Sequence, residues 1–229
     1  MIQLIKTVIL SVILVTCLAL KTEAITISGN GSFNIAYLVP KGTVGSSGAL
    51  PFDLVGNSTW TITNYSSTGF DLSISMKNNT VVSPNYASKD ARITAFGFNI
   101  DQDMDISKFK KGTAFLNYGT DTTLPSFNKV DMCIFGGNNC AGGSNGGLFA
   151  GLTDTVSFRL DLADCDDPVK NFTLTTFGMK WQTAWGSFEP EGCVGSSCNT
   201  TTISVEPESI FLILAGLGLM VVLSRYGQA

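Results

Sequence analysis

Short segments in which apolar and polar residues alternate run through most of the chain, and no long segment repeats its apolar residues at the helical spacing. The alternation is clearest at Trp60-Thr61-Ile62-Thr63 and over residues 70–76. A period of two predicts strands with one buried and one solvated face. Together with runs rich in Val, Ile, Thr and aromatic residues, it predicts strands at residues 25–28, 33–39, 58–65, 70–76, 91–99, 129–135, 155–162 and 172–185.

Clusters of Gly, Asn, Asp and Ser separate these strands. Residues 42–48, 77–79, 136–147 and 164–168 are expected to be turns or loops. Several short strands at this spacing are typical of an all-β fold, and we expect a jelly-roll-like β-sandwich over residues 25–191. A segment of that length is one ordinary domain that can bury its own core.

Residues 1–24 have the pattern of a secretory signal. Lys6 supplies an early charge, residues 7–20 are mostly apolar, and small residues at Thr22 and Ala24 predict cleavage after Ala24. The apolar stretch is shorter than the roughly 20 residues that a spanning helix needs. An uncleaved N-terminal anchor is the alternative interpretation.

A second hydrophobic segment lies near the other end of the sequence. Residues 192–209 are small and polar and predict a spacer, and the apolar residues 210–224 predict a single transmembrane helix. Arg225, within a tail at 225–229, is expected to stay cytoplasmic because basic residues favour that side. A C-terminal core helix is the alternative, but the segment is apolar all round.

The charge and composition exclude several classes of function. The net charge is -4 and no basic cluster occurs, which argues against a nucleic-acid partner. The sequence contains no histidine, so Ser-His-Asp, Cys-His and His-zinc chemistry is impossible in this chain. We therefore expect no enzymatic activity and no cofactor, with a carboxylate-pair hydrolase using Asp161 and Glu189 as a further alternative.

Five cysteines follow the predicted signal. An exported chain meets an oxidising compartment, where disulfides form. Two pairs close in sequence are expected to bond, Cys133–Cys140 and Cys193–Cys198. Cys165 is then either unpaired or bonded to one of the other four, since spacing alone does not fix the connectivity.

Alternating carboxylates at Asp101, Asp103 and Asp105 are the best candidates for a calcium ion, because hard cations prefer oxygen ligands. The segment does not match an EF-hand, since Ile106 stands where that loop requires glycine. A solvated acidic loop is the alternative.

Two tryptophans lie four residues apart, at Trp181 and Trp185. A continuous strand would place both on one face. There they would either pack in the core or form a platform on which a sugar ring stacks.

The segment that precedes and includes the second hydrophobic run carries a recognisable motif. Val205, Glu206, Pro207, Glu208 and Ser209, followed by the apolar run and Arg225, resemble the PEP-CTERM sorting signal of bacteria, with Val205 in place of the first proline. The resemblance implies export by the secretion machinery, signal peptidase cleavage, retention in membrane lipid and processing by an exosortase-type enzyme.

The segment between the two hydrophobic ends has a resemblance of its own. Residues 130–133 lead through Cys140 into a glycine-rich run, and residues 95–100, 154–162 and 172–181 complete a pattern that resembles the cistern family of PEP-CTERM proteins. This resemblance implies an exported surface or matrix protein and brings no catalytic residue.

These resemblances and the composition lead to one expected function. We expect a membrane-tethered protein of the bacterial envelope or extracellular matrix with a structural or adhesive role. The alternative is an envelope module that binds carbohydrate or calcium, with extracellular polysaccharide as a further candidate partner.

Overall fold

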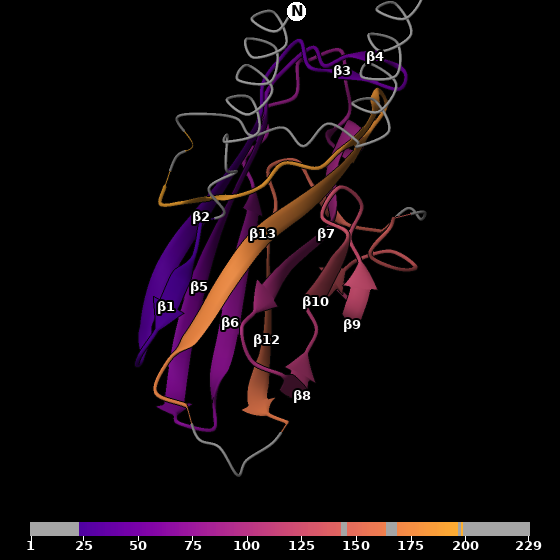
Figure 1. The fold of residues 1–229 in the computed structure, drawn as a ribbon. Helices are drawn as coiled ribbons and strands as arrows, with labels where there is room; N and C mark the ends of the chain where they lie inside the picture. The colour runs from indigo at the N-terminus through magenta and orange to yellow at the C-terminus, as the bar shows by residue number, and fades with distance from the viewer. Residues whose placement is uncertain (1–22, 143–145, 164–168, 197, 199–229) are drawn as a thin grey trace, which may run out of the picture.

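The structure is a computed structural model that describes residues 23–142, 146–163, 169–196 and 198. These residues confirm the all-β prediction (Figure 1). The expected transmembrane segment, the sorting motif and all but the last two residues of the expected signal lie outside the described residues. The elements are β1 (Ile25–Ile27), β2 (Gly31–Val39), β3 (Val44–Gly45), β4 (Gly48–Ala49), β5 (Leu54–Ser66), β6 (Gly69–Asn78), the 3-10 turn η1 (Ser88–Asp90), β7 (Ala91–Ile100), β8 (Met104–Lys110), β9 (Asn117–Thr123), β10 (Lys129–Phe135), β11 (Leu148–Phe149), β12 (Thr153–Leu162), β13 (Phe172–Thr183), β14 (Gly186–Phe188) and β15 (Cys193–Val194).

Two antiparallel sheets pack face to face in a β-sandwich-like arrangement. Sheet A has the order β1-β13-β7-β10-β9, with β11 paired to β7 and β14 paired to β13. Sheet B has the order β15-β2-β5-β6-β12-β8, and β3 and β4 form a separate hairpin. In Figure 1 the long strand β13 of sheet A crosses in front of β5 and β6 of sheet B. No helix in the described segments has the length and hydropathy to cross a bilayer.

The core lies between the two sheets and follows from the alternating pattern of the strands. Trp60 on β5 is fully buried, and its ring meets Phe98 and Phe177 of sheet A at centroid distances of 5.0 and 5.4 Å. The indole Nε1 donates a 2.8 Å hydrogen bond to the hydroxyl of Ser58, so its one polar group is satisfied. Each large side chain buried in this way contributes about 1.5 to 3 kcal/mol.

The sequence pattern found the central strands and missed those at one edge. Segments β8 and β9 were not expected to be strands, because most of their residues are polar and their buried faces are incomplete. Edge strands pack on one side only and therefore alternate weakly. The strand expected over 172–185 ends two residues earlier, at the close of β13, and a tight turn then leads into β14.

A smaller apolar cluster covers the outer face of sheet A. The turn after β9 folds back so that Leu124 and Phe127 lie over β7 and β13. Gly178 permits this close approach, since a β-carbon there would lie 2.7 Å from Phe127 Cδ2 and 2.8 Å from Leu124 Cδ2. Beside it, Lys180 and Glu189 form an ion pair whose side chains are only 5% and 9% exposed.

The chain after β14 joins the two sheets along one side. Gly192 donates a 2.7 Å backbone hydrogen bond to Phe177 of sheet A, and the next residues form β15 on β2 of sheet B. Residues 192–196, expected as part of a spacer, thus lie on the sheets. Burial, together with the nearby Glu23, raises the pKa of the Glu191 carboxyl above its usual value.

Candidate functional site

A cleft of about 300 Å³ opens where the two sheets end, between the edge strands β8 and β9. Its floor is apolar and comes from strands of both sheets, with Phe98, Met132 and Leu160 among the lining residues. Its rim is polar because the turn between β7 and β8 and the outer residues of β9 and β10 meet there. The polar residues are Asp101, Gln102, Asp103, Thr120, Asp121 and Asp131.

Three of the four rim carboxylates are bonded to the protein. Asp101 accepts a 2.9 Å hydrogen bond from the backbone N–H of Thr173, and Asp131 accepts one of 2.8 Å from that of Ile100. Asp121 forms a salt bridge of 2.8 Å with Lys129.

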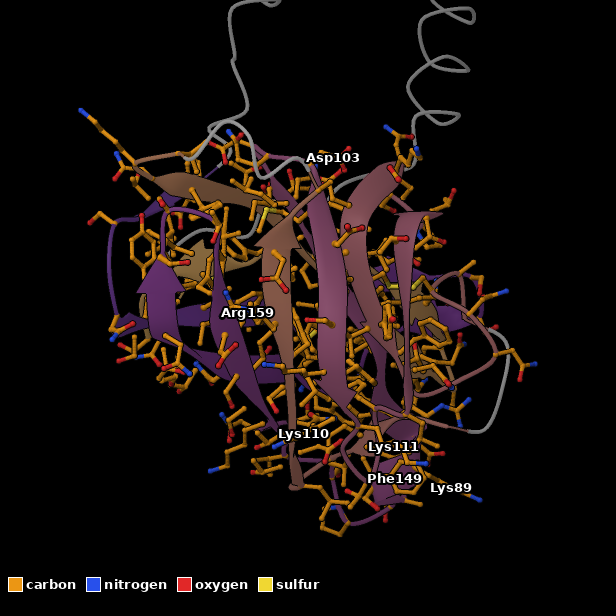
Figure 2. The ribbon with its side chains drawn as sticks, turned by 90° about the horizontal axis from the view of Figure 1, so that it is seen from below. Lys89, Asp103, Lys110, Lys111, Phe149 and Arg159 are labelled. Atoms are coloured by element: carbon orange, nitrogen blue, oxygen red, sulfur yellow. A yellow bond between two sulfur atoms is a disulfide. The ribbon has the colours of Figure 1, made fainter. Side chains whose placement is uncertain are left out.

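The fourth carboxylate, that of Asp103, is exposed at the start of β8 (Figure 2). No hydrogen bond or ion pair joins this carboxylate to another of the described residues. Asp103 is therefore the rim carboxylate most available to a ligand.

The three aspartates expected to bind calcium do not converge on one point. Asp101 and Asp103 line the cleft, but Asp105 lies within β8, opposite Asp161 of β12. Among the described residues, no three His, Cys, Asp or Glu side chains form a group that could hold a metal ion.

The arrangement of the cleft determines what it can do chemically. Carboxylate, amide and hydroxyl oxygens above an apolar floor can accept hydrogen bonds from the hydroxyl groups of a small polar ligand. The cleft resembles a binding site more than a site for proton transfer, since three of its carboxylates are already bonded to the protein.

The two tryptophans do not share a face. Trp181 is fully buried and packs edge-to-face against Tyr37 in the core, with ring centroids 6.4 Å apart. Trp185 lies in the turn between β13 and β14 and packs against Phe52 and Tyr86, at 5.5 and 4.9 Å. The prediction of one continuous strand was wrong here. The glycine at position 186, with φ of +130°, was the signal for a turn.

The two carboxylates of the hydrolase alternative belong to different sheets. Asp161 on β12 forms a salt bridge of 2.6 Å with Arg159 and accepts a 3.0 Å hydrogen bond from the hydroxyl of Ser107. Glu189 follows β14 of sheet A and bonds to Lys180 and to the hydroxyl of Ser126. Each is occupied by its own partners, so the two do not form a catalytic pair.

Both expected disulfides are present, Cys133–Cys140 and Cys193–Cys198. Cys133 and Cys140 are buried in the apolar cluster on the outer face of sheet A. Closing loops this short contributes about 2 to 3 kcal/mol, mainly by restricting the unfolded chain. Cys165 lies outside the described residues.

A second concavity was not anticipated from the sequence. A groove of about 210 Å³ lies on the outer face of sheet B, and the cations Lys108, Lys110 and Arg159 line it. The sequence contains one indication of it, the closely spaced lysines within residues 108–111. In the fold, the outward face of β8 brings lysines of this segment next to residues of β12.

The acidic cleft and the basic groove lie toward opposite ends of β8. Comparison of the chain with protein-family models, with curated proteins and with solved structures finds no match.

Proposed function

We propose that the chain is an exported, membrane-tethered protein of the bacterial envelope or extracellular matrix, with a structural or adhesive role. The observation that carries this proposal is the pair of disulfides in the described fold. Disulfides persist in oxidising compartments outside the cytoplasm and are rare within it. The secretory pattern over residues 1–24 agrees with that location.

The fold suits a scaffold. Its buried core, antiparallel strands and disulfides favour a rigid body that resists unfolding. We also propose a jelly-roll-like connectivity, supported by the way successive strands alternate between the sheets. The chain passes from β7 in sheet A to β8 in sheet B, then to β9 and β10 in A, β12 in B and β13 in A.

The proposed route uses both hydrophobic segments of the sequence. The N-terminal signal directs export, and residues 210–224 hold the chain in the membrane with Arg225 on the cytoplasmic side. The motif from Val205 to Ser209 is the proposed recognition site for an exosortase-type processing enzyme.

Truncation before Ser204 tests this route. The full chain should fractionate with membranes, whereas the truncated chain should be exported freely because it lacks the apolar segment. Cell fractionation measures the distribution, and alkylation of free thiols before lysis reports whether the disulfides have formed. Full chain that stays dissolved in the cytosol with reduced thiols would refute the proposal, as would truncated chain that remains with the membrane.

The cleft supports a second candidate function, an envelope module that binds carbohydrate or calcium. The geometry of the rim suits carbohydrate better, because no three carboxylates among the described residues form a metal group. Asp103 is the key residue, since its carboxylate can accept hydrogen bonds from sugar hydroxyls.

Substitution Asp103→Asn should weaken the binding of neutral oligosaccharides to the full chain severalfold, since hydrogen bonds to a charged acceptor are the stronger kind. Asp105→Asn is the matched control, because Asp105 is exposed only two residues further along the chain but does not line the cleft. A calorimetric titration measures both. Equal effects of the two substitutions on binding would show that the oligosaccharide does not bind in the cleft.

A further inference from the structure

The outer face of sheet B carries the basic groove described above. Lys108, Lys110 and Arg159 line it, while Asp71 is its one acidic residue. Arg159 is neutralised by salt bridges to Asp71 at 3.2 Å and to Asp161 at 2.6 Å. Neither lysine forms a salt bridge with another described residue. Two cations without a salt-bridge partner in the described structure thus face one groove on a chain whose net charge is -4.

A β-bulge in β8 lies at the two lysines. Between Ser107 and Lys110, strand β8 has one more residue than the facing segment of β12. Lys108 occupies the bulge with a left-handed φ of +53°, a conformation that non-glycine residues seldom adopt. Residues two apart share a face of a strand, and Lys108 and Lys110 both line the groove although the bulge interrupts the regular alternation of β8.

A row of hydroxyl groups leads across the sheet to Lys110. The strand registers align Ser32, Thr61, Ser73, Ser157 and Lys110 on successive strands β2, β5, β6, β12 and β8. Neighbouring strands lie about 4.8 Å apart, so the row is about 19 Å long. All five side chains are exposed or half-buried. Figure 2 shows Lys110 at the opposite end of β8 from Asp103, with Arg159 at an intermediate height.

We propose that this face binds an acidic polysaccharide. The sugar chain lies along the hydroxyl row, and a uronate carboxylate binds between Lys108 and Lys110 beside Arg159. This inference rests on the adhesive role proposed above, and it names the chemical class of the partner to which the protein adheres. The charge of the groove favours an anionic ligand, and the uncharged hydroxyl row favours a ligand that is itself rich in hydroxyls.

The same surface argues against a lipid partner. A protein that binds a membrane surface combines basic residues with apolar side chains that enter the lipid. Among the described residues, the strongly exposed large apolar side chains are Val44, Val81, Tyr86, Leu116, Tyr118, Leu152 and Val194. None of them comes from β5, β6, β8 or β12, which form the groove.

Binding of polygalacturonate to the detergent-purified full chain tests the proposal. The double variant Lys108→Gln/Lys110→Gln should bind this probe about tenfold more weakly, since two charge contacts near a surface are removed. The charge-matched control Lys41→Gln/Lys89→Gln removes two exposed lysines outside the groove and should bind like the original chain. Lys108→Arg/Lys110→Arg should retain binding, and thermal melts establish that each variant is folded.

Polymers of different chemistry distinguish the possible ligands. Dextran, a neutral polymer, should bind at least tenfold more weakly than polygalacturonate, and raising the salt concentration should weaken polygalacturonate binding. Equal affinity of the Gln double variant and its control would overturn the proposal, and so would tighter binding of polyphosphate than of polygalacturonate. If the chain fractionates with membranes but does not bind polygalacturonate, this inference is refuted and the proposed export stands. If the chain binds polygalacturonate but stays in the cytosol, the proposed export is refuted and this inference stands.

Discussion

Replacing Asp154 with Asn is expected to lower the free energy of unfolding by about 3 kcal/mol. Asp154 lies on β12, is 5% exposed, and fixes the connection between β8 and β9. Its carboxylate accepts hydrogen bonds from the backbone N–H groups of Thr113, Ala114 and Phe115 at 2.8, 2.9 and 2.9 Å, and from the Thr113 hydroxyl at 3.1 Å. An amide would turn an N–H₂ donor toward these donors. Urea unfolding at pH 7 measures the loss.

Two further measurements separate this effect from a general loss of charge. The control Asp105→Asn removes an exposed carboxylate from the neighbouring strand and should change stability by less than about 0.5 kcal/mol.

Burial alone would raise the pKa of Asp154, but the four hydrogen bonds outweigh it and hold the pKa below its usual value. The stabilisation is thus fully present above the unfolded pKa of about 3.9 and is lost as pH falls through the lower folded pKa. If the Asp154→Asn variant lost stability in acid as steeply as the original chain, this assignment would be contradicted.

Substitution of Lys180 by Met is expected to cost about 3 to 5 kcal/mol, because it leaves the Glu189 carboxylate buried without its cation. The two side chains are 5% and 9% exposed beneath the turn that covers sheet A. The double variant Lys180→Met/Glu189→Leu should recover most of that loss, since well-packed apolar groups often replace a buried ion pair at little cost. Chemical denaturation of the two single variants and the double variant measures the coupling.

An exposed ion pair elsewhere in the fold supplies the control. Lys129 and Asp121 form a salt bridge of 2.8 Å, but their side chains are 66% and 71% exposed. Lys129→Met should therefore change stability by at most about 1 kcal/mol. If it destabilised the protein as much as Lys180→Met, or if the double variant were no more stable than the single one, burial would not be the cause.

The parts of the fold that the sequence predicted are those where one face of a strand is fully buried. Trp60 and Ile62 on β5 alternate with exposed threonines, so the period of two is unmistakable. Strands β8 and β9 lie at the sheet edges, where one side of each strand has no neighbouring strand. Polar residues occur on both of their faces. Their strand character comes from pairing with β12 and β10, which a local pattern does not contain.

The candidate sites were less predictable because they depend on which distant residues meet. The sequence indicates Asp101 and Asp103, but the cleft that they line also includes Asp131, which the pairing of β10 with β7 brings to it. Arg159 meets Lys108 and Lys110 because β12 pairs with β8. Trp181 and Trp185 were separated by a turn that ends the strand two residues before the second tryptophan.

The short path from β14 to β15 has a mechanical consequence. A load applied to the chain beyond residue 198 enters the fold at the rim of sheet B, where β15 pairs with β2. The Cys193–Cys198 bond carries that load across the intervening residues, so tension reaches Cys193 without first straightening them. The backbone bond from Gly192 to Phe177 then passes part of the tension to sheet A. Pulling at that point would strain both layers at once, whereas an edge strand anchored to one layer would peel away from it.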